Sequence, residues 1–262
     1  MIVDRVKEDH FKEVCSMMGE PLDLHLAYRS AKELMGSKDG SMSNWNCIKK
    51  IQDRWYESLP NNPDYDVYSE PMYIAEIWAC WVKYTSKYIK ALSKSGSLDG
   101  KRSIVEYIGE RPIIDLGCGF GYSTCALSEV FNSDIYCTNI EGSFQSKIVL
   151  KLSKEYPIKL HYDFDDLPKN SLIFASEYFE HFERPFEHLD DVIKNLKPKH
   201  LLIANTFNGD AIGHFDTYLH KKKRVHSSVA QRLFGKAMRH YGYKRINTKL
   251  WNNRPSLWSR IK

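Results

Sequence analysis

The chain has 262 residues, of which 42% are hydrophobic, 13% aromatic and 27% charged. This composition is typical of a globular protein with a sizeable core, and it excludes collagen-like and disordered classes. The length allows one large domain or one domain with an extension. The formal net charge of +5 is mild. It is compatible with an anionic substrate or with nucleic acid, and it requires neither.

The hydrophobic segments and the cysteines indicate the class of protein and its compartment. No apolar run approaches the ~18–20 residues that span a bilayer, and the first five residues lack the apolar region of a signal peptide. The six cysteines form no Cys-x-x-Cys pair. We therefore expect a cytoplasmic protein with reduced thiols and no membrane partner, and we predict neither a disulfide framework nor a metal site.

Residues 1–110 are expected to be helical. Apolar residues recur at helical spacing between positions 72 and 92, with lysines between them. A turn-rich stretch, Ser95–Gly100, follows. The tryptophans of this region are expected to fill a helical core or to line a pocket: Trp45, Trp55, Trp78 and Trp81.

From about residue 111, strands are expected to alternate with helices. The expected strands are 112–116, 134–138, 158–162, 171–175 and 200–204. The expected helices are 123–131, 144–155, 185–196 and 227–241, and residues 243–262 predict one or two edge strands. This alternation predicts an α/β fold with a mostly parallel sheet and helices on both faces. Ligands of such sheets bind at the carboxyl ends of the strands.

The most specific motif is the stretch Asp115–Gly121, with the sequence DLGCGFG. It joins the first expected strand to a helix that is expected to begin at Ser123 or Thr124, both good N-cap residues. Glycines permit positive φ angles and let the backbone approach a ligand, and a helix N-terminus offers free N–H groups. The Gly-x-Gly-x-Gly spacing differs from the Gly-x-Gly-x-x-Gly dinucleotide fingerprint. The motif predicts a cofactor loop, and the alternative is a tight turn without a ligand.

This motif resembles motif I of the class I (Rossmann-like) S-adenosylmethionine-dependent methyltransferases, whose pattern is [D/E]-x-G-x-G-x-G. The resemblance implies a Rossmann-like methyltransferase fold and S-adenosylmethionine as the cofactor. In that family the acid contacts the methionine amino end and the glycines line the cofactor. The cofactor-binding residues implied here are Asp115, Gly117, Cys118, Gly119 and Gly121.

The resemblance continues to about residue 205. After the second strand the family usually has an acid that binds the ribose, and the implied ribose-binding residues here are Asn139, Ile140, Glu141 and Gln145. Glu141 has the alternative of a solvated acid at a helix N-terminus. After the third strand, residues 163–168 are similar to the family's D-x-x-x-L-P stretch. This implies that Asp163 accepts from the adenine amino group and that Phe164 contacts the adenine.

The stretch after the fourth expected strand, Ser176–His181, looks like the Glu-His dipeptide common in small-molecule methyltransferases of this class. Methyl transfer mainly requires an aligned nucleophile and exclusion of water, and a general base helps where the acceptor is a hydroxyl or a protonated amine. The candidate catalytic residues are expected where the carboxyl ends of the strands converge, and they are His181, Glu177, His214 and Glu180. Glu177 is also a candidate for cofactor binding. The alternative for His181 is a structural role in the local turn.

The sequence therefore predicts a helical N-terminal extension or cap over residues 1–110 and a methyltransferase domain over residues 111–262. The expected reaction transfers a methyl group to oxygen or nitrogen of a small molecule or modified building block. One alternative is a nucleic-acid methyltransferase, for which Lys221–Arg224 would contact phosphates. The other is a binding protein that retains the fold without turnover, since Asn139 and Ser171 stand where the family usually has acids.

Overall fold

A computed structural model describes residues 46–59, 62–70, 73, 77, 81, 85–209, 211–250 and 255–261, with residues 46–49 described by backbone alone. The chain forms two compact units: residues 1–87 with 210–213, and residues 88–209 with 214–262. The predicted functional division near residue 110 stays a prediction.

The first unit contains the helix α4 (Asn46–Ser58) and the 3-10 helix η1 (Tyr65–Ser69). Trp55 is fully buried, and its ring meets the Tyr65 ring edge-on with centroids 5.8 Å apart. Trp81 is also buried, whereas Trp45 and Trp78 lie outside the described residues. Most of the predicted helix over 72–92 lies outside them too, and its last part is the helix α6 (Ser86–Ala91).

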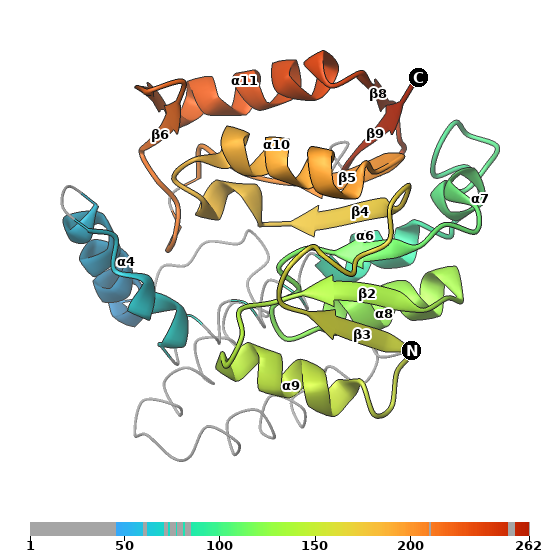
Figure 1. The fold of residues 1–262 in the computed structure, drawn as a ribbon, viewed down its shortest axis with the longest axis horizontal. Coiled ribbons are helices and arrows are strands. Elements are labelled where there is room, and N and C mark those ends of the chain that lie inside the picture. The colour runs from blue at the N-terminus through green and yellow to red at the C-terminus, as the bar shows by residue number, and fades with distance from the viewer. Residues whose placement is uncertain are drawn as a thin grey trace. The chain divides into compact units, whose positions relative to one another are not determined.

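The second unit is built on a seven-stranded sheet with the order β3-β2-β1-β4-β5-β9-β8 (Figure 1). The strands are β1 (Ile113–Asp115), β2 (Ile135–Thr138), β3 (Ile158–His161), β4 (Leu172–Ser176), β5 (His200–Ala204), β8 (Tyr243–Ile246) and β9 (Ser256–Arg260). The first five strands pair in parallel, whereas β9 is antiparallel to both of its neighbours. Without β9, the order is that of a doubly wound dinucleotide-binding sheet. The predicted Rossmann-like, mostly parallel sheet is thus confirmed.

The position of β9 corrects one expectation. Residues 243–262 were expected to supply edge strands, and β8 is indeed at the edge. The strand β9 lies inside the sheet, between β5 and β8, and is buried along most of its length. Its central residues are apolar (Leu257, Trp258), as expected for a strand that is covered on both faces.

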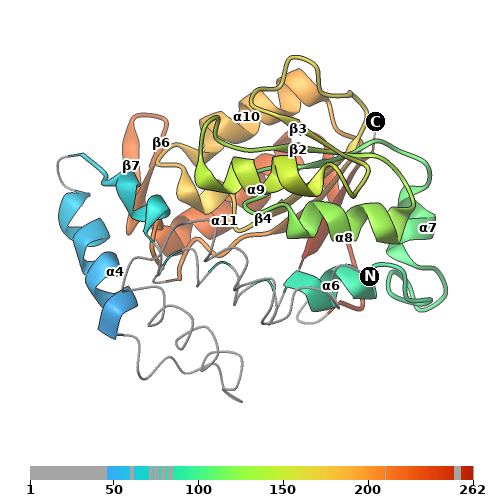
Figure 2. The same cartoon turned by 90° about the horizontal axis from the view of Figure 1, so that it is seen from below.

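Helices flank this sheet (Figures 1 and 2). They are α7 (Ile104–Ile108), α8 (Tyr122–Phe131), α9 (Phe144–Leu152), the 3-10 helix η3 (Phe179–His181), α10 (Pro185–Leu196) and α11 (Ser227–His240). The predicted bounds of α10 are confirmed: Pro185 stands in its first turn, and Lys197 ends it in a left-handed conformation. Its buried side chains recur at helical spacing (Phe186, Leu189, Val192, Ile193, Leu196). None of the described helices is long and apolar enough to cross a membrane.

A two-stranded hairpin of β6 (Thr217–His220) and β7 (Lys223–His226) precedes α11, and the sequence patterns did not predict it. Its two-residue turn is Lys221 and Lys222, with φ angles of 48° and 67°. Turns with two positive φ angles normally carry Asn-Gly, because most side chains are strained there. The hairpin therefore holds two lysines at its tip at a cost in backbone energy.

Candidate functional site

The loops after four strands meet at the carboxyl edge of the sheet. Backbone hydrogen bonds join two of these loops to neighbouring strands. From the loop after β1, Cys118 N donates to Thr138 O (3.0 Å) and Leu116 N to Phe174 O (2.9 Å); from the loop after β4, Glu177 N donates to Ala204 O (2.8 Å). The chain leaves β1 toward β2 on one side, and β4 lies on its other side. This is the switch point at which open α/β sheets bind ligands.

The glycine loop after β1 has the conformation that the sequence predicts. Gly117, Gly119 and Gly121 all have positive φ angles (61°, 55° and 79°). A Cβ atom added to Gly117 would stand 2.4 Å from Cδ2 of Tyr178, so only glycine fits beneath this ring. The Gly117 N–H donates to the Thr138 hydroxyl at 3.0 Å, which fixes the loop against β2.

The start of α8 differs from the prediction. The helix begins at Tyr122, and its N-cap is Gly121 rather than Ser123 or Thr124. Both hydroxyls instead donate to Oδ2 of Asp115, at 2.6 Å and 2.7 Å. The helix thus has no side-chain cap at its N-terminus, the end at which helices bind anions and other acceptors.

The Asp115 carboxyl is buried at the end of β1. Burial raises its pKa to about 7, and the hydrogen bonds from Ser123 and Thr124 oppose this rise. Both hydroxyls bind the same oxygen, Oδ2, so Oδ1 retains its capacity for a further donor. A cation bound here would favour the ionised form.

Asn139, at the expected ribose position, holds two loops together. Its Nδ2 donates to the Gly119 carbonyl at 2.7 Å, and its Oδ1 accepts from the Ile140 N–H at 2.9 Å. Ile140 is 71% exposed and Glu141 is exposed beside it, while Gln145 lies in the first turn of α9. Ile140, Glu141 and Gln145 thus follow Asn139, the residue that binds the glycine loop. Their contacts with the ribose stay a prediction.

Asp163 and Phe164 follow β3 at the same edge. The Asp163 side chain is exposed and accepts from the Asp165 N–H at 3.1 Å. The half-buried Phe164 ring lies 6.0 Å from the His188 ring, between centroids. An exposed acceptor beside an aromatic ring suits an adenine edge, and this role also stays a prediction.

Sequence analysis did not identify Tyr178, whose ring lies over Gly117. Its hydroxyl is 2.8 Å from Nε2 of His188, and the His188 ring stacks on Phe182 with centroids 3.9 Å apart. Burial lowers the pKa of His188 to about 4 and raises that of Tyr178. The two groups are therefore neutral at pH 7, and they fix the ring over the loop. No local sequence motif predicts the position of the Tyr178 ring, because Gly117, Tyr178 and His188 lie on separate elements.

The four candidate catalytic residues come together at the ends of β4 and β5. Oxygens of Glu177 and Glu180 and a ring nitrogen of His214 all lie within 4.8 Å of one another. The His181 and His214 rings are 5.0 Å apart between centroids. Glu180 is fully buried, and its burial and the nearby Glu177 raise its pKa well above the ordinary value.

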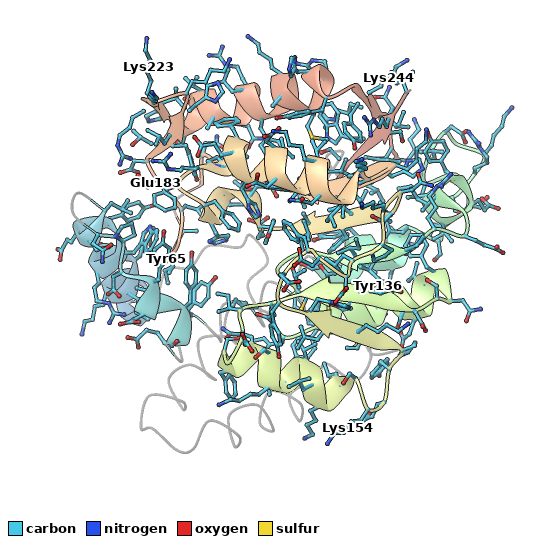
Figure 3. The ribbon with its side chains drawn as sticks, in the orientation of Figure 1. Tyr65, Tyr136, Lys154, Glu183, Lys223 and Lys244 are labelled. Carbon is cyan, nitrogen blue, oxygen red and sulfur yellow. The ribbon has the colours of Figure 1, made fainter. Side chains whose placement is uncertain are left out.

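The basic run Lys221–Arg224 is the tip and second strand of the β6–β7 hairpin. Arg224 is 2.6 Å from a carboxylate oxygen of Glu183, so part of its charge is used within the protein. The Lys223 side chain points away from the ribbon (Figure 3). The tip therefore presents lysines to solvent, as a phosphate contact would require, and that contact stays a prediction.

Comparisons with known proteins agree with this geometry. No protein-family model matches the sequence, and no curated protein matches it. A solved O-methyltransferase family protein from Burkholderia thailandensis is similar over 90% of this chain and 72% of its own, with a TM-score of 0.54 and 10% identity. The apo form of the S-adenosylmethionine-dependent methyltransferase SibL is similar over 90% and 74%, with a TM-score of 0.52 and 12% identity. Together with the strand order, these similarities show that the chain has the Rossmann-like fold of the class I S-adenosylmethionine-dependent methyltransferases.

Proposed function

We propose that the protein is an S-adenosylmethionine-dependent methyltransferase whose acceptor is an oxygen or nitrogen of a small molecule or modified building block. The observation that carries this proposal is the glycine loop at the switch point. Its three glycines have positive φ angles, the helix that follows has no side-chain cap, and a buried acid stands beside it. The resemblance of the motif and the shared fold support the choice of cofactor.

The residues at this edge fit the parts of S-adenosylmethionine. Asp115 offers Oδ1 to the methionine ammonium, and the three glycines, which have no side chains of their own, let the backbone of residues 117–121 approach the ligand. The ribose would contact the loop after β2 and the adenine the loop after β3, through the following residues: Asn139, Ile140, Glu141, Gln145, Asp163 and Phe164. When bound, the cofactor supplies a sulfonium methyl group with a good leaving group.

The chain's own residues then have to orient the acceptor, exclude water and hold its proton. The Tyr178 ring lies against Gly117 of the glycine loop, where it would help to exclude water once the cofactor is bound. Glu177, His181 and His214 gather beyond the end of β4, where His181 would receive the acceptor's proton. A general base contributes typically 10²–10⁴-fold to the rate, so alignment by the loop and the strand ends has to supply much of the remainder.

Calorimetry with S-adenosylhomocysteine and S-adenosylmethionine tests the cofactor assignment. We expect one saturable site, and Gly119→Arg should abolish binding because the new side chain would fill the loop. The matched control is Gly100→Arg, which introduces the same side chain at a similar φ (83°) in an exposed turn with open space around it. Absence of binding by both ligands at millimolar concentration would refute the proposal.

A second candidate function is methylation of a nucleic acid, favoured by the lysines at the hairpin tip. Lys221 and Lys222 have strained backbone conformations, and Asn-Gly would make this turn more stable. The presence of two lysines at these positions suggests that their positive charges contact a ligand such as a phosphate. Binding of single-stranded RNA and DNA should then weaken steeply with salt. A flat or absent response would leave the small-molecule acceptor.

A further inference from the structure

We propose that Glu177, Glu180 and His214 bind a divalent first-row transition-metal cation, with Mn²⁺ as the best match, at the carboxyl ends of β4 and β5. The role that we assign to the cation rests on the proposed methyl transfer. Its binding does not, because it can be measured without cofactor or acceptor.

The three side chains converge from two separate loops. Glu177 directly follows β4, Glu180 lies in η3, and His214 comes from the segment after β5. One candidate ligand atom from each lies within 4.8 Å of the other two. A single cation at ~2.0–2.3 Å from each atom fits between ligands at this spacing.

Glu180 is the first sign that this convergence serves a cation. Its side chain is fully buried beside a second carboxylate, and one oxygen accepts from the Thr206 N–H at 2.7 Å. Within the described part of the chain, no lysine or arginine pairs with Glu180. Buried carboxylates are costly unless they are paired or bind a metal. A cation held between Glu177 and Glu180 would offset this cost.

His214 supplies the second, independent sign. The residue is only 4% exposed, and Nδ1 lies 2.8 Å from the Gly209 carbonyl oxygen. A carbonyl only accepts, so Nδ1 carries the proton, and the neutral ring has its lone pair on Nε2. Metal-binding histidines almost always donate their other N–H to a carbonyl or carboxylate in this way. The Gly209 carbonyl therefore prepares His214 to bind through Nε2.

The donor set indicates which cation fits. Carboxylate oxygens suit Mg²⁺, Ca²⁺ and Mn²⁺, whereas imidazole favours transition metals. Two carboxylates with one imidazole therefore favour Mn²⁺ over Mg²⁺. Three protein ligands leave further coordination positions of the cation open. Glu177 is exposed at the edge of the site, so water or an acceptor can reach these positions.

The cation gives this edge of the sheet a definite role in the proposed reaction. A hydroxyl oxygen of the acceptor bound to the metal would lose its proton more readily, because the cation stabilises the anion. The proton would pass to water or to His181, whose ring is 5.0 Å from that of His214. The site therefore selects an oxygen acceptor among the alternatives.

The test is a titration of MnCl₂ into the chelator-treated full chain. Continuous-wave electron paramagnetic resonance measures the free Mn²⁺, and pulsed spectra detect nitrogen bound to the cation. We expect about one Mn²⁺ per chain, with nitrogen hyperfine coupling from His214. Glu177→Gln and His214→Gln should each raise the dissociation constant at least tenfold, and His214→Gln should remove the nitrogen coupling. Glu177 is exposed, so its variant is not expected to disturb the core, and thermal unfolding checks both proteins.

Glu183→Gln is the matched control, since it makes the same chemical change three residues beyond Glu180 and outside the cluster. It should bind Mn²⁺ as the unaltered chain does. The proposal is overturned if no saturable Mn²⁺ binding occurs up to millimolar concentration, or if both cluster variants bind as tightly as the control. S-adenosylhomocysteine binding, measured on the same samples, separates this failure from that of the proposed function.

Discussion

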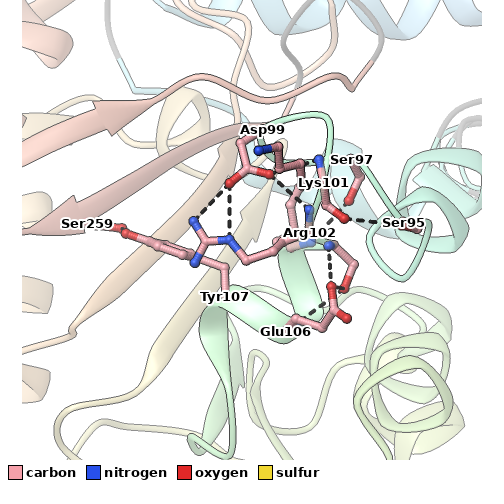
Figure 4. Close-up of polar contacts among 10 residues, drawn as sticks. Ser95, Ser97, Asp99, Lys101, Arg102, Glu106, Tyr107 and Ser259 are labelled. Atoms are coloured by element: carbon pink, nitrogen blue, oxygen red, sulfur yellow. Dashed lines mark hydrogen bonds and ion pairs between the residues drawn. The ribbon is translucent and has the colours of Figure 1, made fainter.

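The two edges of the central sheet differ in how their polar groups are satisfied. At the amino edge, the Ser259 hydroxyl accepts from the Tyr107 hydroxyl at 3.2 Å and lies 2.8 Å from Nδ1 of His200, at the start of β5. In the preceding segment, Ser103 and Glu106 form a reciprocal cap on α7, and Arg102 pairs with Asp99 (Figure 4). These polar groups bind one another, whereas the buried Ser171 hydroxyl and Arg111 Nε at the same edge have no hydrogen-bond partner in the described part of the chain.

At the carboxyl edge, polar groups keep capacity for a ligand. Asp115 has one oxygen engaged by two hydroxyls, Glu180 is buried beside Glu177, and Glu177 itself has a φ of 49°. Such features cost stability and tend to gather at functional sites. At the amino edge, hydrogen bonds between side chains therefore stabilise the fold, whereas the carboxyl edge keeps polar groups that can bind a ligand.

The largest expected effect is at the glycine loop. Gly117→Ala should lower the affinity for S-adenosylhomocysteine by about 100-fold or more and destabilise the chain by about 2–4 kcal/mol, because its Cβ would overlap the Tyr178 ring. Gly142→Ala is the control, since Gly142 has a similar φ (72°) and nothing within 4 Å of an added Cβ. It should cost only about 1 kcal/mol. Calorimetry and urea unfolding measure both, and equal losses would contradict the steric argument.

The second effect is the pH dependence of binding at Asp115. Burial raises the pKa of this carboxyl to about 7, so it is mostly neutral below that pH and mostly ionised above it. If the ionised form binds the methionine ammonium, affinity for S-adenosylhomocysteine should rise about tenfold between about pH 6 and about pH 8. In Asp115→Asn the rise should disappear. A rise that persists in this variant would assign it to another group.

The contrast between the edges also explains how much the sequence could predict. The strand–helix alternation and the glycine loop were predictable because their signals are local: residues 115–121 contain the whole motif, and α10 carries its own start, apolar face and stop. The predicted N-cap of α8 was wrong because the helix begins earlier, at Tyr122. Ser123 and Thr124 lie inside its first turn and donate their hydroxyls to the buried Asp115.

Some features that join distant segments were not predictable. Tyr178 meets Gly117 only through the pairing of β1 with β4. The approach of His214 to Glu180 was expected, because both residues follow strands whose carboxyl ends meet at one edge of a parallel sheet. The β6–β7 hairpin was missed because its turn carries two lysines instead of Asn-Gly. The position of β9 depends on which strand of the sheet still has an unpaired edge, and no local sequence pattern predicts that strand.

At the amino edge, His200 should make the free energy of unfolding depend on pH. Burial, with Arg111 and Lys199 nearby, lowers the pKa of His200 to about 4. In the unfolded chain the pKa is about 6.5, so between these values the unfolded chain takes up a proton that the folded chain does not. The free energy of unfolding should therefore fall by about 1–2 kcal/mol as the pH falls from about 7 to about 4, after allowance for solvent screening.

Urea unfolding at several pH values measures this loss. In His200→Asn the fall should be smaller by the same amount, while the affinity for S-adenosylhomocysteine at pH 7 should not change, because the histidine lies at the edge opposite the glycine loop. An unchanged pH slope in His200→Asn would show that other groups carry the loss.

The smallest expected effect concerns the tip of the β6–β7 hairpin. Replacing Lys221 by Asn and Lys222 by Gly would give the turn its preferred residues and remove two positive charges. The double variant should be more stable by about 0.5–1 kcal/mol. If it also loses RNA or DNA binding, the charge and not the fold of the hairpin carries that binding. Lower stability would contradict the proposed backbone strain.

The interior position of β9 has a consequence for biosynthesis. This strand is formed by residues 256–260, yet it separates β5 from β8 in the finished sheet. While the chain is being translated, the first five strands can therefore pair before β9 exists, and β5 then presents an unpaired strand edge. Such edges are prone to wrong pairing with other chains. The slowest and most vulnerable step of folding should therefore be the late insertion of β9, which depends on contacts between segments far apart in the chain.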